Sequence, residues 1–400
     1  MGALVISQGG PLRFFEQLDP RNASHVCFDV NSHEPRVFCD FANVYYPQGE
    51  SLRQSADAVR GFYYSPFFGV CMRAIAVLPF AFARAVWFAI VLSATAVVVC
   101  LPSLLELAKP HASVASTLVL ATSLPLLHDL IYGQVSSILL ALIALSFVAY
   151  RRERRLLSAV LLGLATAIKF YPALFALFYL ARRDLRSTLY FTGTVFSCVV
   201  LIPWLFLGSH GYLTFVASIA QNLEELRRYL EHTPYSNAAV TVLSSAGRRW
   251  LKLGELANPS ALLLAACIAF ALLGLLVRSA RRNDPLSALL LGASALPFVV
   301  RSCWVHYFVF LPLLQSYVLL ASREKDGSPA LRWCGLVGPV ISVTLLSYPY
   351  FRLFGDADSY YRAGFPFWAT VAVLPGLFLT QFSQPSAGRG SNNDACVPRP

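Results

Sequence analysis

The sequence predicts an all-α polytopic membrane protein, and its composition carries that prediction. Of its 400 residues, 56% are hydrophobic and 13% are charged, whereas soluble globular chains carry about 25% charged residues. The mean hydropathy is +0.58. The net charge of +11 comes from arginines grouped between apolar runs, as in the cytoplasmic loops of membrane proteins. The positive charge therefore indicates which loops face the cytoplasm, and we expect no nucleic-acid partner.

The nine cysteines form no CxxC pair and no array with histidine. This pattern argues against a zinc or redox site, so we expect neither a metal ion nor a cofactor. Cys27 and Cys39 are the only cysteines among the first 62 residues. If this segment faces an oxidising compartment, they are expected to form a disulfide that restricts the chain beside Asp40.

Residues 1–62 are predicted to be an N-terminal segment followed by a first outer loop. Residues 1–20 hold no apolar run of the roughly 20 residues needed to span a bilayer, and no obvious signal peptide. Asp40 stands among aromatic and apolar neighbours in the stretch CDFANVYY, residues 39–46. At a membrane surface such a carboxylate can act as a general base for a hydroxyl nucleophile. The alternative is that Asp40 caps a helix over residues 42–60.

Residues 63–383 are predicted to be the membrane domain, a bundle of roughly ten to twelve helices with loops on the outer face. The apolar runs cover residues 66–79, 80–106, 113–127, 135–150, 156–180, 187–207, 259–277, 286–300, 303–321, 330–347 and 367–382. Residues 384–400 are predicted to be a disordered cytoplasmic tail.

Arginine-rich clusters indicate which loops face the cytoplasm. They lie at residues 151–155, 182–186, 278–282 and 323–325. Alternation from the second cluster places residues 208–258, 301–307 and 348–366 on the outer side. Within the first of these outer segments, residues 221–231 are expected to form a surface helix with a mixed charged face.

The run 156–180 has arginines at both ends, so a single crossing cannot connect them. Lys169-Phe170-Tyr171-Pro172 interrupts the run, and proline removes a helical donor and disfavours helix in the preceding residue. We predict two half-helices that enter from the cytoplasm and return, with Lys169 near the tip. Broken helices of this kind line cavities. With this hairpin, the loops alternate consistently between the two sides of the membrane only if run 66–79 or run 113–127 does not cross it.

Polar residues inside apolar spans are costly and are candidates for function. The candidates are His128, Asp129, Gln134, Lys169 and His306. Lys169 could bind a lipid phosphate, or could simply extend its ammonium to the interface. His128 and Asp129 could instead form an interfacial turn between two spans. An aromatic belt explains the tryptophan and tyrosine on either side of His306, but not the histidine itself.

Short motifs run in order through the chain from the first outer loop to the His306 region. They are Asp40-Phe41 with Tyr45-Tyr46, Tyr64-Ser65-Pro66-Phe67, Pro79 with Trp87, Gly133-Gln134, Gly163 through Lys169 and Pro172, Ser236-Asn237, and Trp304 with His306-Tyr307. As an ordered set they resemble the integral-membrane GT-C glycosyltransferases, specifically glycosyltransferase family 87. Such proteins usually begin with a membrane helix, which residues 1–20 do not supply.

The resemblance implies a GT-C-like helical bundle in the plasma (inner) membrane with its active site on the outer face. It implies transfer of a sugar, typically mannose, from a polyprenyl-phosphate donor to a hydroxyl of a lipid-linked or glycan acceptor, without a metal. The family's catalytic aspartate corresponds to Asp40, and its histidine near the donor phosphate to His306. The remaining candidates for substrate binding are Lys169, Tyr45, Tyr46, Gln134 and Arg301.

These assignments agree with the chemistry, because a hydroxyl nucleophile needs a base and a phosphate leaving group needs cations. Two other classes stay open at this point. A secondary transporter also uses broken helices and buried charges, although only the run 156–180 is clearly interrupted. A non-catalytic membrane assembly protein would tolerate replacement of Asp40 and His306.

Overall fold

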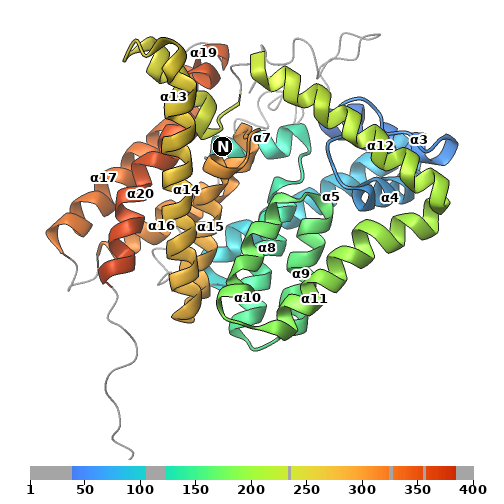
Figure 1. Cartoon of the computed structure of the whole chain (residues 1–400), viewed down its shortest axis with the longest axis horizontal. Coiled ribbons are helices and arrows are strands. Elements are labelled where there is room, and N and C mark those ends of the chain that lie inside the picture. Colours follow the sequence, from blue (N-terminus) through green and yellow to red (C-terminus); the bar gives the residue numbers. More distant parts are fainter. Residues whose placement is uncertain (1–37, 105–122, 233–235, 324–327, 355–356, 384–400) are drawn as a thin grey trace, which may run out of the picture.

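The computed structural model describes residues 38–104, 123–232, 236–323, 328–354 and 357–383 (Figure 1). Within these ranges the chain is built of helices and contains no strand, apart from an isolated bridge between Ser123 and Ser347. The all-α prediction is therefore confirmed. The predicted tail, residues 384–400, lies outside the described residues, and so does Cys27.

The first described segment joins the residues before position 63 to the first helices of the predicted membrane domain. It comprises a π-helical turn η2 (Phe41–Tyr45), α3 (Tyr46–Gln54), α4 (Pro66–Ile75) and α5 (Phe80–Leu104). Helix α3 lies directly against α4 at the right of Figure 1. An aromatic core, which includes Tyr45 and Tyr64 at 5.2 Å between ring centroids, joins residues 38–62 to the helices that follow.

The centre of the molecule holds a bent helix pair and a helical hairpin. Helices α7 (Leu124–Tyr132) and α8 (Ser136–Arg151) meet at 117°. Helix α9 (Arg155–Ile168) packs on α8 and is followed by a 3₁₀ turn η3 (Tyr171–Ala176) and α10 (Leu177–Ala181).

Lys169 interrupts the helix between α9 and η3 with extended backbone. The two arms then return side by side, since the hydroxyls of Ser158 and Tyr179 share a hydrogen bond of 2.6 Å across them. The predicted break and hairpin are confirmed, while their orientation in the membrane stays a prediction.

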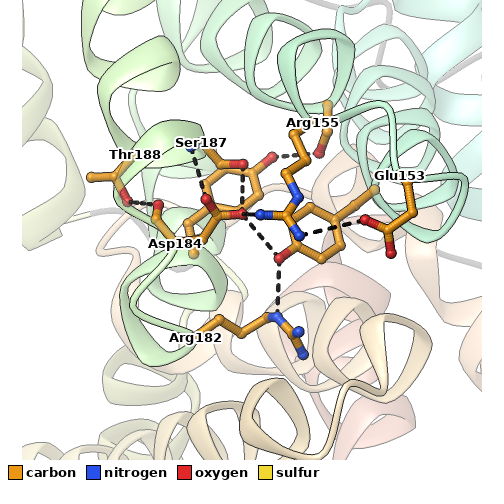
Figure 2. Close-up of polar contacts among 9 residues, drawn as sticks. Glu153, Arg155, Arg182, Asp184, Ser187 and Thr188 are labelled. Carbon is orange, nitrogen blue, oxygen red and sulfur yellow. Dashed lines mark hydrogen bonds and ion pairs between the residues drawn. The ribbon is translucent and has the colours of Figure 1, made fainter.

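A polar cluster around Asp184 closes the base of this hairpin (Figure 2). Its carboxylate accepts hydrogen bonds from the Ser187 amide at 3.1 Å, the Ser187 hydroxyl at 2.8 Å and the Tyr150 hydroxyl at 3.1 Å. Arg155 lies 3.6 Å from the same carboxylate, and Arg182 donates to the Tyr150 hydroxyl at 3.0 Å. The two arginine clusters at the hairpin ends therefore lie together, as the sequence predicts.

The next helices form a long arm on the right of Figure 1: α11 (Leu185–Phe196), a π-helical turn η4 (Ser197–Leu201) and α12 (Ile202–His232). Gly208, with φ +71° and ψ 172°, has non-helical backbone and divides α12 into two helices that meet at a kink. Residues 221–231 are helical with exposed charged side chains, as predicted, although they form the end of α12. The outer-side placement of residues 208–258 stays a prediction. Apolar residues continue past the kink, and Phe215 and Ile219 are buried on the domain, so the helix resumes.

The C-terminal half forms the group of helices at the left of Figure 1, where α14 packs on α15 and α17 on α20. Its elements are α13 (Ala239–Arg249), η5 (Gly254–Leu256), α14 (Ala257–Arg281), α15 (Pro285–Val299), η6 (Val305–Phe310), α16 (Leu311–Ala321), α17 (Pro329–Leu345), α18 (Tyr348–Phe354), α19 (Ala357–Arg362) and α20 (Phe365–Ser383).

Four helical segments in the described residues are long and apolar enough to cross a membrane, or five if the bent α7–α8 pair is one span. They are Phe80–Leu101, Leu185–Arg228, Gly254–Arg281 and Phe365–Phe382. These segments support an integral membrane protein, whereas the count of ten to twelve membrane helices stays a prediction. Helix α4 rises only about 15 Å, half of a bilayer core of about 30 Å. Run 66–79 is therefore too short to cross as a helix.

Candidate active site

Asp40 does not act as a helix cap. It precedes the η2 turn, but its side chain makes no capping hydrogen bond, so the capping alternative is wrong. Instead, its carboxylate accepts a hydrogen bond from the side-chain amide of Gln134. The backbone of Phe38 donates to the carbonyl of Ile131 at 2.7 Å, and this contact ties the start of the described chain to the α7–α8 bend.

Gln134 connects Asp40 to two buried tyrosines. The Tyr45 and Tyr64 hydroxyls lie 3.1 and 3.2 Å from Gln134 Oε1 and 2.5 Å from each other. Because the tyrosine hydroxyls donate to Oε1, the amide nitrogen faces Asp40. Tyr45 is fully buried and Gln134 is 4% exposed. Both residues were expected to bind substrate, and the structure places both behind the carboxylate, where they fix its position.

The bend between α7 and α8 holds Gln134 in place. Gly133 there has φ +64°, and a Cβ at this position would lie 2.4 Å from Phe38 Cδ1, so only glycine fits. Trp87 Nε1 donates to the Gly133 carbonyl at 2.8 Å. Asp129 accepts from the Ser137 amide at 3.0 Å and the Ser137 hydroxyl at 2.5 Å. Asp129 therefore stabilises a turn between two helices, the alternative role considered from the sequence.

Lys169 lies at the hairpin tip between two aromatic rings. Its ammonium is 4.9 Å from the centre of the Tyr64 ring and 4.4 Å from that of Tyr307, close enough for cation–π attraction. Tyr64 thus contacts both halves of the site, through its hydroxyl to Gln134 and through its ring to Lys169. This arrangement differs from a lysine that extends to the membrane interface.

The electrostatics of Asp40 follow from this arrangement. Burial raises the pKa of the Asp40 carboxyl to about 7, although the positive charge of Lys169 lowers it. A carboxyl with this pKa is ionised in a large fraction of molecules near neutral pH, and is basic enough to accept a proton there. The arrangement can therefore support general base catalysis.

His306 reaches the same region from η6. It is 5% exposed, and its Nδ1 atom has no hydrogen-bond partner among the described residues. Its ring centroid is 5.1 Å from that of Tyr307, which also contacts Lys169, and 5.6 Å from that of His128. The described residues contain no group of three or more His, Cys, Asp or Glu side chains that could hold a metal ion.

Two of the expected binding residues lie elsewhere. Tyr46 packs on Phe80 at 5.1 Å between ring centroids, and its hydroxyl donates to the Leu78 carbonyl at 3.1 Å. Arg301 has an exposed side chain, and its carbonyl accepts a hydrogen bond from Ser236 Oγ at 3.2 Å. The structure thus brings together Asp40, Lys169 and His306, with the tyrosine–glutamine network behind Asp40.

Tyr64 and Tyr307 were not among the site residues expected from the sequence. Both belong to the motifs noted above, but the pairing of each ring with Lys169 joins residues far apart in the chain. Cys39, next to Asp40, is disulfide-bonded. Its expected partner, Cys27, lies outside the described residues, so the pairing itself stays a prediction.

Comparison with known proteins gives a family match. Residues 62–303 match the model of glycosyltransferase family 87. Over 329 residues the chain is 26% identical to a Mycobacterium tuberculosis (strain CDC 1551 / Oshkosh) polyprenol-phosphate-mannose-dependent alpha-(1-2)-phosphatidylinositol pentamannoside mannosyltransferase. That match covers 80% of this chain and 72% of the relative. No solved structure matches the chain. Gln134 and Lys169 lie inside the family match, whereas Asp40 lies 22 residues before its start (62 − 40) and His306 lies three residues after its end (306 − 303).

Proposed function

Since the chain belongs to glycosyltransferase family 87, we propose that it transfers a hexose from a polyprenyl-phosphate sugar to a hydroxyl of a lipid-linked or glycan acceptor. We take the hexose to be mannose, because the mycobacterial relative is named for that donor. The enzyme is an integral membrane glycosyltransferase. The proposed location is the plasma (inner) membrane, with the active site on its outer face.

The observation that carries the proposal is the placement of Asp40 and Lys169 on either side of Tyr64. Gln134 holds the carboxylate on one side, and the Tyr64 ring contacts the ammonium on the other. The charge of Lys169 also lowers the Asp40 pKa, so a general base and a cation lie near each other, as transfer from a phosphate leaving group to a hydroxyl requires.

Asp40 removes the proton of the acceptor hydroxyl as its oxygen forms a bond to the anomeric carbon. The bond between that carbon and the phosphate oxygen breaks, and the polyprenyl phosphate leaves with the electron pair. Lys169 stabilises the added negative charge, and His306, with its unpartnered nitrogen, donates a hydrogen bond to the phosphate. Hydrogen bonds to charged groups contribute more than neutral ones.

The transporter and assembly-protein alternatives predict no dependence of sugar transfer on Asp40. The test is transfer by purified, full-length Asp40→Asn from a defined polyprenyl-phosphate mannose in lipid vesicles, with donor binding measured on the same sample. Loss of a general base should lower turnover about a hundred- to ten-thousandfold, while donor binding is retained.

Asp57→Asn is the matched control, because Asp57 lies in the same outer segment and is exposed. We expect it to keep parental transfer. Transfer by Asp40→Asn at the parental rate would eliminate Asp40 as the base. Absence of sugar transfer by the parental protein from every polyprenyl-phosphate sugar would overturn the donor class.

A further inference from the structure

An open groove runs along the outside of the hairpin that carries Lys169 and shares no residue with the candidate active site. It lies between the start of α9 and the neighbouring α11 and η4, which pack side by side with α9 (Figure 1). Its volume of about 380 Å³ falls within the range of about 300 to 1,000 Å³ that is typical of ligand sites. Most of its lining is apolar or small, and includes Leu156 from α9, Leu189, Gly193 and Thr194 from α11, and Cys198 from η4.

Gly193 leaves the floor of the groove open. A Cβ at this residue would meet no heavy atom within 4 Å, whereas a Cβ at Gly163 of α9 would lie 2.7 Å from the Thr194 side chain. The two helices therefore touch at Gly163 and Thr194, and the space lies beside that contact. Leu156 is 57% exposed and Leu189 is 70% exposed, so the groove opens to the surroundings of the helices and not to the core.

The groove has the depth of one leaflet of a bilayer. The apolar segment that contains α11 begins at Leu185, so Arg186 lies at a membrane surface. From Leu189 to Cys198 a helix rises about 14 Å, which is about half of a hydrocarbon core of about 30 Å. Arg186 precedes the lining residue Tyr190 by four residues, and so lies one turn before the groove on the same helix face.

Positive charge gathers at this surface end. The two clusters at the hairpin base, residues 151–155 and 182–186, carry seven arginines and two acidic residues. Arg155 lies 3.6 Å from Asp184 (Figure 2), whereas exposed Arg186 makes no ion pair with a described residue. Helix α9 also begins here without a side-chain cap, so its first amides can donate to an anion. The charge at this end therefore complements a phosphate.

We infer that the groove binds one acyl chain of an anionic phospholipid, whose phosphate contacts Arg186 and the start of α9. The hydrocarbon would fill the space beside the contact of Gly163 with Thr194 and hold α11 against the hairpin that carries Lys169. This inference does not depend on the proposed reaction.

Three lining residues carry hydroxyl groups, which need partners beside a hydrocarbon chain. The Thr194 hydroxyl donates to the Tyr190 carbonyl at 2.8 Å within the helix. Tyr190 lies at the surface end, where its own hydroxyl can reach the ester groups of a lipid or water. Ser197 begins the π-helical turn η4, and a helical serine can donate to the carbonyl of the preceding turn.

A lipid fits this groove better than a second copy of the chain. Small residues such as Gly193 also occur where membrane helices associate. A two-fold symmetric dimer, however, would bring the same surface of both copies together. Helices crossing in the same direction would then place Arg186 and its arginine-rich neighbours beside their own copies, and like charges repel.

The test titrates the purified full-length protein with dioleoyl phosphatidylglycerol and dioleoyl phosphatidylcholine, which have identical chains and differ in headgroup charge. Native mass spectrometry resolves each bound lipid and gives its affinity. We expect phosphatidylglycerol to bind about tenfold more tightly, because arginines near a membrane surface attract anionic lipid. Arg186→Gln should remove most of this preference. The matched control is Arg281→Gln, which changes an exposed arginine at the end of α14 and should preserve it.

Gly193→Leu tests the groove itself, because the new side chain occupies the space of the acyl chain and its Cβ meets no neighbour. Affinity for both lipids should fall about tenfold or more, the loss of about two methylene contacts, with the headgroup preference retained. Gly274→Leu is the matched control, since a Cβ at this glycine of α14 is equally unobstructed. Leu156→Ala serves if Gly193→Leu fails to insert, and should also weaken both lipids.

Equal binding of the two lipids by the parental protein would overturn the inference, and so would parental affinities in Gly193→Leu. The same spectra report the oligomeric state. A dimer that Gly193→Leu dissociates would assign the groove to a second copy of the chain and would overturn the lipid assignment as well.

Discussion

The side-chain amide of Gln134 donates a hydrogen bond to the carboxylate of Asp40, although 94 residues separate them in the sequence. The oxygen of the same side-chain amide accepts hydrogen bonds from the hydroxyls of Tyr45 and Tyr64. A glutamine in this position holds the carboxylate in one orientation without adding a charge. Precise placement of a catalytic base matters because small displacements reduce rates strongly.

Gln134→Ala should lower the turnover number about tenfold or more, with donor affinity close to parental, because Asp40 loses its positioning contact. Gln134→Glu should move the acidic limb of the pH–rate profile to higher pH, since a second carboxylate raises the pKa of its neighbour. Gln54→Ala, at an exposed site in α3, is the control. A profile in Gln134→Glu that matches the parental one would exclude this role.

The parental pH–rate profile should show activity lost as the pH falls below about 7, because burial raises the Asp40 pKa to about 7 and a protonated base cannot accept a proton. Lys169→Ala should shift this limb to higher pH, since Lys169 lowers the Asp40 pKa. Lys169→Arg should leave the limb in place. The measurement is kcat/KM as a function of pH. Loss of activity only near the ordinary pKa of an aspartate would contradict the assignment of Asp40 as the base.

Lys169→Ala and His306→Ala should each impair use of the donor more than they impair folding. Loss of one charge-assisted contact to phosphate is worth roughly 1.5 to 3 kcal/mol, or about ten- to a hundredfold in affinity or rate. Lys169→Arg separates charge from geometry. Parental turnover in both alanine variants, at normal levels of membrane insertion, would show that neither residue handles the phosphate.

The Asp184 cluster should stabilise the hairpin that carries Lys169 (Figure 2). Burial raises the pKa of Asp184, but hydrogen bonds from Ser187 and Tyr150 and the charge of Arg155 outweigh it, so the pKa lies below its usual value. Because the folded-state pKa is depressed, this stability is present above the unfolded pKa and is lost as the pH falls.

Asp184→Ala should therefore destabilise the protein near neutral pH by about 1 to 3 kcal/mol, as its buried partners lose an acceptor. Glu153→Ala, whose side chain is 74% exposed at the same hairpin base, should change stability little. The measurement is the free energy of unfolding of each variant at several pH values. An effect of Asp184→Ala that does not shrink toward acid pH would contradict the charge-based account.

Topology can be tested with single engineered cysteines. Buried positions, such as Ser158 and Ser187, would resist labelling on either side. Arg152 and Arg186 are exposed and lie in the two arginine clusters at the hairpin base, so they suit this test. In a background lacking the native cysteines, both should be protected from an impermeant thiol reagent applied outside. A cysteine at exposed Arg228 should react as the positive control. Outside labelling at position 152 or 186 would reject a cytoplasmic hairpin base.

Much of the architecture follows from local sequence. Composition determined the all-α membrane class, because so many apolar residues cannot be buried within a soluble chain of this length. The proline and lysine at residues 169–172 determined the helix break, since proline removes a backbone donor. The order of the motifs determined the family, which the match over residues 62–303 confirms.

Other features depend on contacts between distant residues, which local patterns do not encode. The apolar run 187–207 does end where Gly208 leaves the helical backbone, but the sequence did not predict that the helix after it buries Phe215 and Ile219 on the domain. The capping role considered for Asp40 gave way to a hydrogen bond from Gln134, because the bend at Gly133 aims that amide at the carboxylate.

The sequence by itself determined which residue types could act as base and cation, because charged groups among apolar residues are costly and conspicuous. Only the tertiary structure decided that Tyr64 and Tyr307 enclose Lys169 and that His128 lies beside His306. Those pairings arise from side-chain packing between helices distant in sequence, and the geometry of such packing is set by the whole fold.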